Sequence, residues 1–279
     1  MPRARRFDWN NLGLRIVSGA VLAPAALAIV WIDVRAFLVL ISIAVALLSI
    51  EWGQMVAPAA PVRVAATVMV TVLAAVFLTY LRQTWAGWGI IAFGALGAAV
   101  AFRRLTARAM DAAYGVLYIA PACLALIWLR QTLQGQGWTV MLLSTTWAAD
   151  ICAFAAGNAL KGPKLWPRFS PNKTWSGFFG GLLGAVAAAV AVPGLPILPG
   201  GRPLMHLSLA GAALIGLTAG LATMMGDLWE SMLKRRFGVK DSGDLIPGHG
   251  GLLDRVDGLM FATMVFAAAR LIVRYGWAH

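Results

Sequence analysis

Long apolar runs constrain this chain more than any other feature of its sequence. A helix needs about 20 mainly apolar residues to cross the hydrocarbon core of a bilayer. Nine stretches fit that description approximately: Arg15–Ile32, Ala36–Val56, Val62–Tyr80, Ala86–Phe102, Ala112–Leu129, Trp138–Gly157, Gly177–Leu198, Leu204–Met225 and Gly258–Tyr275. The first is long for the core of a signal peptide and no convincing cleavage site follows it, so we expect it to be retained. The pattern predicts an all-α, polytopic integral membrane protein with about nine transmembrane helices.

The composition excludes other classes of protein. Of the 279 residues, 60% are hydrophobic and only 12% are charged, whereas a soluble domain carries about 25% charged residues. The chain therefore has too little charge to cover a water-exposed surface, and it is too apolar to be disordered. Its two cysteines cannot form a disulfide framework.

The formal net charge of +12 has two possible explanations. In a soluble protein it would suggest nucleic acid, whereas in a membrane protein it can reflect the excess of Lys and Arg in cytoplasmic loops. If the N-terminus is cytoplasmic and the nine spans alternate, 17 of the 23 basic residues, including every Lys, fall on the cytoplasmic side. This asymmetry predicts an N-in, C-out topology and argues against a nucleic-acid partner. Merging Val62–Tyr80 with Ala86–Phe102 would move later basic loops outside, so we expect two separate helices there.

The acidic residues are concentrated near the C-terminus. Six of the eleven lie within one stretch of 31 residues: Asp227, Glu230, Asp241, Asp244, Asp254 and Asp257. Topology does not require this, because Asp and Glu contribute little to orientation. We therefore expect an N-terminal transmembrane region of about five helices (1–137) and a catalytic region (138–279) with cytoplasmic motif loops at 158–176 and 226–257.

The last of these loops combines carboxylates that could bind a cation. Asp254 and Asp257 are three residues apart and share a face if the last helix begins there. With Asp227, they could supply oxygen ligands to Mg²⁺, which takes one or two carboxylates and completes its shell with water and phosphates. The alternative is that such Asp residues only complement a helix N-terminus.

The same loop also carries groups that could bind phosphate. Lys234, Arg235, Lys240 and Arg255 are potential donors to phosphate oxygens, and 247–251 is a glycine-rich turn that leads toward a helix. Alone, the basic residues could equally be topological or lipid-facing. Together with the carboxylates, they indicate a Mg²⁺-dependent polyphosphate site at a membrane surface.

The preceding loop holds a second candidate segment. Asp150 lies inside an apolar span, where a charged group costs about 2.5–3.5 kcal/mol, so its default interpretation is functional; a buried Asp satisfied by nearby hydroxyls is the alternative. Downstream, Ser170-Pro171 is expected to form a turn or helix N-cap. Lys173 offers an ammonium near the membrane surface, with Trp175 as an interfacial anchor.

These segments resemble those of a known family, the phosphatidate cytidylyltransferases (CDP-diacylglycerol synthases). The C-terminal resemblance rests on Ser231-x2-Lys234-Arg235-x4-Lys240-Asp241-x-Gly243-x2-Ile246-Pro247-x-His249-Gly250-Gly251-x2-Asp254-Arg255-x-Asp257. Ser170-Pro-Asn-Lys-Thr-Trp-x-Gly177 and Asp150 followed by Gly157 are similar to two further elements of the family. Departures occur at Ile151, Phe154 and Ser176. The first 110 residues resemble the family only in composition.

The resemblance implies transfer of a cytidylyl group from CTP to phosphatidic acid, giving CDP-diacylglycerol and pyrophosphate for phospholipid biosynthesis. It implies Mg²⁺, with a second cation as an open possibility, a homodimer, and a location in the bacterial cytoplasmic (inner) membrane. We assign catalytic roles, on this basis, to Asp227, Lys234, Arg235, Asp254 and Asp257, with the three Asp as metal ligands. The expected substrate-binding residues are Asp150, Ser170, Lys173, Ser231, Lys240, Asp241, His249, Gly250, Gly251 and Arg255.

Other functions remain open at this stage. A CDP-archaeol synthase or a lipid kinase would share much of the headgroup chemistry. A secondary transporter could use Asp150 and Glu51 as relay groups, but it predicts paired helix breaks in two halves of the chain, and the charged motifs all follow residue 149. A basic loop residue is one possible partner of Glu51, which lies near the end of the second span and whose function the sequence leaves undetermined.

Overall fold

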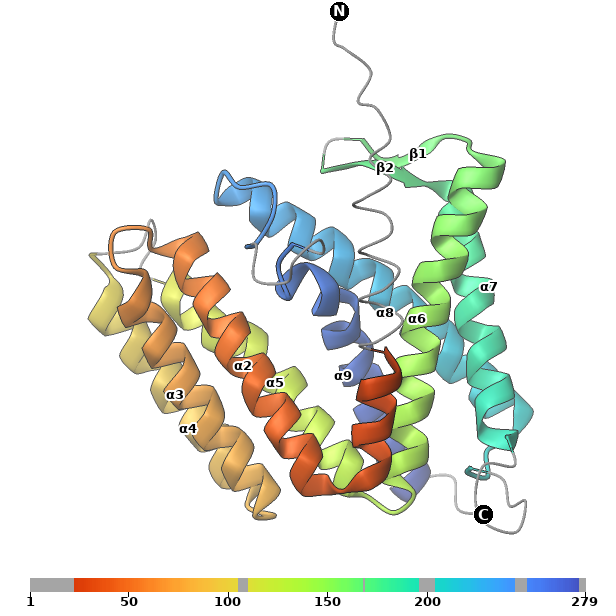
Figure 1. Ribbon diagram of the computed structural model, residues 1–279, viewed down its shortest axis with the longest axis horizontal. Helices are drawn as coiled ribbons and strands as arrows, with labels where there is room; N and C mark the ends of the chain where they lie inside the picture. The colour runs from red at the N-terminus through yellow and green to blue at the C-terminus, as the bar shows by residue number, and fades with distance from the viewer. Residues whose placement is uncertain (1–22, 105–109, 168, 196–203, 244–249, 276–279) are drawn as a thin grey trace, which may run out of the picture.

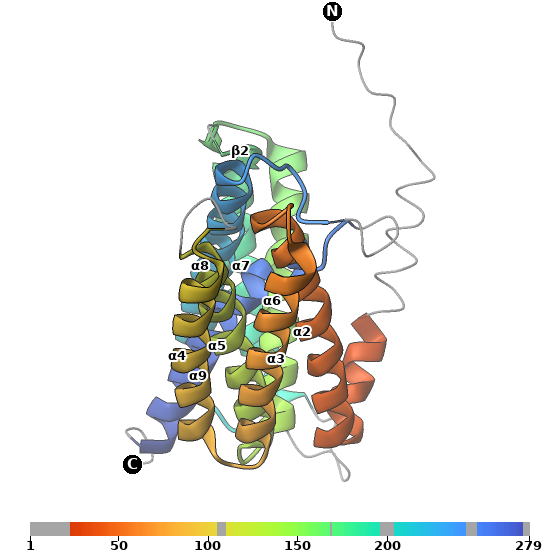
Figure 2. The same cartoon turned by 90° about the vertical axis from the view of Figure 1, so that its left-hand side faces the viewer.

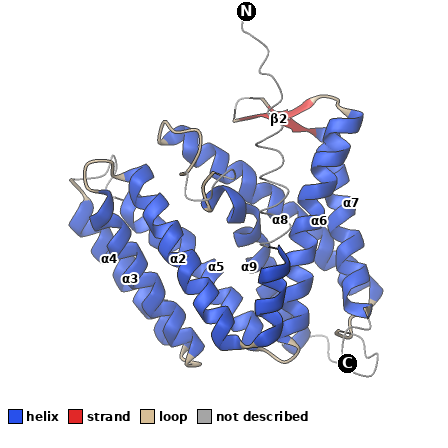
Figure 3. Ribbon diagram, in the orientation of Figure 1, coloured by secondary structure: helices blue, strands red, loops and turns tan. Residues whose placement is uncertain are grey.

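The protein is an all-α polytopic membrane protein whose described part contains eight helices long and apolar enough to cross a membrane. The structure, a computed structural model, describes residues 23–104, 110–167, 169–195, 204–243 and 250–275. Helices dominate it (Figure 3). The long helices are α2 Val34–Val56, α3 Pro61–Tyr80, α4 Thr84–Phe102, α5 Asp111–Gln131, α6 Gly135–Leu160, α7 Trp175–Ala191, α8 Leu209–Arg236 and α9 Leu253–Tyr275.

Eight of the nine predicted spans correspond to these helices. The first prediction is tested only in part, because a shorter apolar helix at Ala23–Ile32 is described and the rest of that run lies outside the described residues. The expected separation of α3 from α4 is confirmed. The connecting turn contains Arg82, whose φ of +66° is in the left-handed region, so the chain reverses direction there instead of continuing as one helix.

Two helix boundaries differ from the expectation. The predicted span Leu204–Met225 corresponds to α8, which begins at Leu209 and continues further, to Arg236. The backbone N–H of Leu204 donates to the Leu195 carbonyl at 3.1 Å before the helix begins, and the Ser208 hydroxyl caps its start by accepting from Gly211 N. It ends late because Glu230 and Leu233 continue its buried face, so much of the segment predicted as a loop is helical. The span expected to reach Leu198 ends as an α-helix at Ala191, before a 3₁₀ turn at Val192–Gly194.

The helices form two groups that meet around α5 and α9. In one group α2, α3, α4 and α5 pack against one another; in the other α6 packs on α7, α7 on α8 and α8 on α9. Figure 1 shows α2–α5 on one side and α6–α7 on the other, with α8 and α9 between them. The perpendicular view shows the long helices running in broadly the same direction (Figure 2). α5 contacts α2, α3, α4, α6 and α9.

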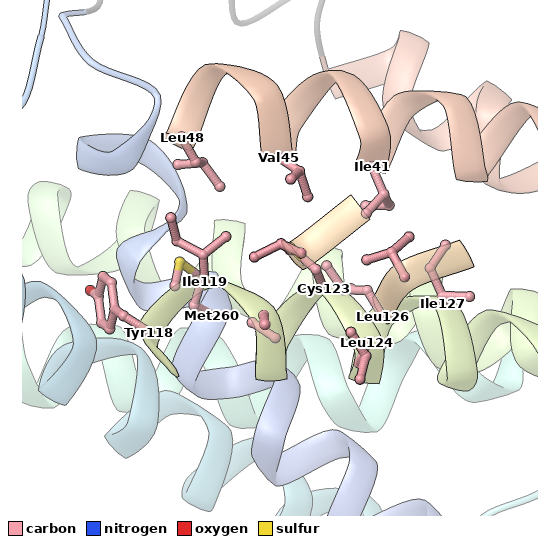
Figure 4. Packing of buried hydrophobic residues seen from close by; sticks show 14 of the residues in the cluster. Ile41, Val45, Leu48, Tyr118, Ile119, Cys123, Leu124, Leu126, Ile127 and Met260 are labelled. Carbon is pink, nitrogen blue, oxygen red and sulfur yellow. The ribbon is translucent and has the colours of Figure 1, made fainter. Parts of the chain in front are cut away.

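The packing of α2 on α5 illustrates how the sequence builds this core. Ile41, Val45 and Leu48 recur at helical spacing, so they share one face of α2. That face points toward Ile119 and Cys123 of α5 (Figure 4), and the three α2 side chains are buried. The following turn of the same face buries Trp52 completely.

A short antiparallel hairpin interrupts the helical architecture. Its strands are β1 Lys164–Trp166 and β2 Ser170–Thr174, and it connects α6 to α7. The hairpin, the C-terminal end of α8 and the connection between α2 and α3 lie at the same end of the bundle (Figure 1). The two motif segments therefore emerge from the same end of the molecule.

Candidate active site

The two motif segments meet through an ion pair between Lys173 in β2 and Asp227 in α8. The Lys173 ammonium donates to the carboxylate Oδ2 of Asp227 across a sequence separation of 54 residues. Both side chains are partly exposed, at 31% and 26%. The pair is therefore ordered and still accessible from solvent.

The hairpin positions Lys173 through its strand pairing and through the start of α7. Thr174 pairs with Lys164, and its hydroxyl accepts a hydrogen bond from Gly177 N at 3.2 Å. Thr174 is thus the N-cap of α7. The expectation that Ser170-Pro171 forms a turn or N-cap is wrong, because Ser170 is held in β2 opposite Trp166 by the strand register.

Close packing of α8 on α9 brings Asp227 near Asp257. At Gly258, an added Cβ would lie 2.7 Å from Thr223 Cγ2 and 3.1 Å from Asp227 Oδ1, so only glycine allows this approach. Asp257 is 8% exposed, and its Oδ1 accepts from Gly258 N at 2.8 Å. It lies within the electrostatic influence of Asp227 and Lys173.

Asp150 belongs to the same charged group. It lies on α6 with an exposed side chain, and the charges of Asp227, Lys173 and Arg255 act on it. The structure therefore brings together residues from both predicted motif segments and from an apolar span. We refer to Asp150, Lys173, Asp227 and Asp257 as the carboxylate–lysine cluster.

The carboxylate–lysine cluster has the chemistry of a site for a hard cation. Mg²⁺ needs only one or two protein carboxylates when substrate phosphates complete its shell, and Asp227 and Asp257 offer two. Within the described residues, no three His, Cys, Asp or Glu side chains already converge as a metal-binding group. That Asp227 and Asp257 hold a cation shared with a phosphate ligand stays a prediction.

Asp254, the third expected metal ligand, contacts Lys234 and Ser242. Its Oδ1 accepts from the Lys234 ammonium, and its Oδ2 accepts from both Ser242 N and Ser242 Oγ at 3.1 Å. Lys234 also pairs with Glu230 at 2.7 Å. One half-buried ammonium therefore serves two carboxylates, and both Asp254 oxygens already have partners. The metal role of Asp254 and the phosphate role of Lys234 stay predictions.

The remaining predicted site residues surround these two clusters. Arg235, Lys240, Asp241 and Arg255 are exposed, Ser231 is half-buried and Gly251 is buried. Gly250 has a φ of +80°, which a residue with a Cβ adopts only with strain. His249 lies outside the described residues, so its predicted role is untested.

Sequence reasoning missed the partners of Glu51. A basic loop residue was one possible partner; instead, its carboxylate accepts hydrogen bonds from Leu252 N and Leu253 N, and its Oε2 lies 3.3 Å from the Ser242 hydroxyl. These donors carry no charge, so no search for an opposite charge could find them. The available signal was the presence of a carboxylate within an apolar span.

A second missed contact joins the N-terminal region to α8. Arg236 donates to Asp111 at the start of α5, and the indole of Trp229 donates to the Tyr114 hydroxyl at 2.7 Å. The Asp111 side chain is almost completely buried. These contacts fix the C-terminal end of α8 against α5.

Comparison with known proteins identifies relatives over nearly the whole chain. A model of the cytidylyltransferase family matches residues 13–273. The chain is 38% identical over 274 residues to a phosphatidate cytidylyltransferase of Brucella suis biovar 1, covering 96% of this chain and 94% of that protein. It is 40% identical over 163 residues to the Pseudomonas aeruginosa protein of the same name, covering 58% of this chain and 57% of that protein. A further relative, from Rickettsia bellii, is 29% identical over 258 residues, covering 92% of this chain and 89% of that protein.

Proposed function

The chain belongs to the cytidylyltransferase family, and we propose that it transfers the cytidylyl group of CTP to phosphatidic acid, giving CDP-diacylglycerol and pyrophosphate. The relatives named phosphatidate cytidylyltransferase support this substrate pair, and the eight apolar helices suit a lipid substrate. The strongest structural support for the proposal is the contact between Lys173 and Asp227, because it joins the two motif segments in a single charged site.

The reaction suits a site rich in cations and carboxylates. A phosphate monoester has a second pKa of about 6, so the phosphate of phosphatidic acid is largely ionised near neutral pH and needs no dedicated general base. One of its oxygens forms a bond to the α-phosphorus of CTP. The bond from that phosphorus to the oxygen bridging the β-phosphate breaks, and pyrophosphate leaves with that oxygen.

The protein's own residues would hold and align the two anionic substrates. Lys173 lies beside the carboxylates, and the exposed Arg235, Lys240 and Arg255 lie at the same end of α8 and α9. Their positive charge would reduce repulsion between CTP and phosphatidic acid and would stabilise charge on the departing pyrophosphate. Arg also suits two-point contacts with phosphate.

Asp227 and Asp257 are the residues we propose for holding Mg²⁺. When bound, the ion would supply charge neutralisation on the phosphate oxygens. Asp150 lies within the electrostatic influence of Asp227 and Lys173, and we keep it as a substrate-binding candidate. Asp254, with both oxygens engaged, would orient Lys234.

We also propose that the motif segments face the cytoplasm of a bacterial cell, in the inner membrane. The distribution of basic residues along the sequence supports this orientation. A homodimer is proposed from the resemblance alone. Accessibility of single cysteines placed at Lys164 and Arg82 to a membrane-impermeant thiol reagent would test the sidedness, with Lys164 expected to be protected in intact cells.

Pyrophosphate release from purified protein tests the reaction directly. We expect release only when CTP, phosphatidic acid and Mg²⁺ are all present, with CMP appearing in the lipid product. Release without phosphatidic acid would contradict the proposal. Phosphorylation of diacylglycerol by a nucleoside triphosphate would instead identify a lipid kinase.

A further inference from the structure

We infer that Glu51 of α2 is a positioning residue that holds the start of α9 and residues 242–243 in the geometry required for cytidylyl transfer. The inference rests on the proposed function. It gives the N-terminal helices, which contain only the weaker part of the sequence resemblance, a direct role at the site. Four sets of contacts lead to it.

The first is the set of hydrogen bonds to the Glu51 carboxylate. Oε1 accepts from Leu252 N at 2.6 Å, and Oε2 accepts from Leu253 N at 2.8 Å. The Ser242 hydroxyl lies 3.3 Å from Oε2. Glu51 is completely buried, so these donors replace the water that an ionised carboxylate would otherwise require.

These hydrogen bonds are made at the first residues of a helix. Leu253 begins α9, and the first N–H groups of a helix have no partner within it. They also form the positive end of the helix dipole, which favours a nearby carboxylate. Here the stabilising group comes from a residue about 200 positions earlier in the chain, so α2 determines where α9 begins.

Ser242 connects Glu51 to the cluster formed by Glu230, Lys234 and Asp254. Its hydroxyl lies 3.3 Å from Glu51 Oε2 and 3.1 Å from Asp254 Oδ2, and its backbone N–H donates to Asp254. Asp254 in turn accepts from Lys234. A shift of Glu51 would therefore be transmitted to Asp254 and Lys234 through Ser242. It would also move Asp257, which lies one turn into α9.

Two glycines allow the site segment to approach Glu51. A Cβ at Gly243 would lie 3.0 Å from Glu51 Cγ, and one at Gly251 would lie 3.1 Å from Oε1. Both distances are tighter than ordinary van der Waals contact. The segments around both glycines therefore pack directly against this one side chain.

The end of α2 is itself held firmly. Trp52, the next residue, is completely buried, and its indole donates to the Asp111 carbonyl at 3.1 Å. Its ring packs against Tyr114 of α5 and, edge-on, against Phe237 after α8. Glu51 therefore extends from a rigid support, which is what a positioning group needs.

The test compares Glu51→Gln and Glu51→Asp with a control in the same helix. Gln keeps the shape of the side chain but presents an N–H₂ group to one of the donors, whereas Asp keeps the charge on a shorter chain. Ser49→Ala is the control, because Ser49 is also completely buried in α2 and its hydroxyl has no hydrogen-bond partner among the described residues. We measure kcat and KM for CTP and for phosphatidic acid below the unfolding temperature of each variant. Backbone hydrogen exchange is followed in peptides covering 250–257.

For Glu51→Gln we expect kcat to fall by roughly 10²-fold, the effect of a small misplacement of reacting groups, with smaller changes in KM. Glu51→Asp should recover part of that loss, and exchange in 250–257 should accelerate only in the Glu51 variants. A wild-type kcat in Glu51→Gln, or an equal loss in Ser49→Ala, would overturn the inference.

If Glu51→Gln does not fold, a second variant tests the same contact from the segment that packs against Glu51. Gly243→Ala crowds Glu51 from the site segment and should lower kcat while α2 is unchanged. A wild-type kcat in this variant would overturn the inference. If the wild-type protein itself shows no phosphatidate-dependent pyrophosphate release, the proposed function fails, which is a different outcome.

Discussion

Lys173 at the end of β2 and Asp227 in α8 form an ion pair that connects two segments 54 residues apart. Both side chains are partly exposed, and exposed ion pairs contribute only about 0–1 kcal/mol to stability. The pair is therefore more important for arranging the site than for holding the fold together. Because the pair contributes little to stability, replacing either residue can change activity without unfolding the protein.

Replacing Asp227 tests the proposed metal and phosphate site. We expect Asp227→Ala to abolish measurable pyrophosphate release, because the carboxylate and the partner of Lys173 are lost together. Insertion into the membrane and the unfolding temperature should change little, since the side chain is 26% exposed. Activity retained by Asp227→Ala at saturating Mg²⁺ would exclude the metal role.

Replacing Lys234 tests the buried cluster that it forms with Glu230 and Asp254. Lys234 pairs with both the buried Glu230 and the half-buried Asp254, and Lys234→Met leaves both carboxylates without this partner, so we expect a loss of about 3–5 kcal/mol in the free energy of unfolding. The added change Glu230→Gln should restore part of that loss. Unfolding followed by tryptophan fluorescence in detergent provides the measurement. Lys164→Met, on the exposed hairpin, should stay within about 0.5 kcal/mol of wild type; an equal effect of the two Lys variants would contradict the expectation.

Replacing Gly258 tests whether the close approach of α8 and α9 matters for activity. The added Cβ of Gly258→Ala would lie 2.7 Å from Thr223 Cγ2, so the helices must move apart and Asp257 must move away from Asp227. We expect a loss of activity of at least about 10-fold. Gly97→Ala in α4 is the matched control, because in the described part of the chain its added Cβ would meet nothing within 4 Å besides its own helix backbone and chain neighbours. Equal activities of the two variants would show that the close approach is not required.

Replacing Thr174 tests the cap that follows Lys173. Thr174→Ala should cost about 1 kcal/mol of stability, and it should also lower activity because Lys173 is the preceding residue. Ser208→Ala removes the corresponding cap of α8, far along the helix from the site. It should cost a similar amount of stability and leave kcat unchanged. If Thr174→Ala affects kcat no more than Ser208→Ala does, the link between the cap and Lys173 is absent.

The membrane fold was largely predictable because it depends on local sequence. Runs of about 20 apolar residues predicted α2–α9, including the separation of α3 from α4. The boundaries of α8 were not predictable from hydropathy. The helix continues to Arg236 with Glu230 buried on its inner face, where it pairs with Lys234 one turn further along α8 and interacts with Asp254 of α9.

The site was predictable in part. Spacing placed Asp254 and Asp257 on one face of a helix, and α9 does begin at Leu253. Their different surroundings were not predictable. Asp254 contacts Lys234 and Ser242, whereas Asp257 lies under the influence of Asp227, and only the crossing of α8 and α9 produces this difference.

By itself, the sequence determined which segments cross the membrane and where the charged chemistry gathers, because hydrophobicity and charge are properties of local stretches. Only the tertiary structure decided that Glu51 caps α9. Its donors are two backbone N–H groups and a hydroxyl from the other end of the chain. Backbone groups are the same in every non-proline residue, so no residue type in the sequence could identify them as partners.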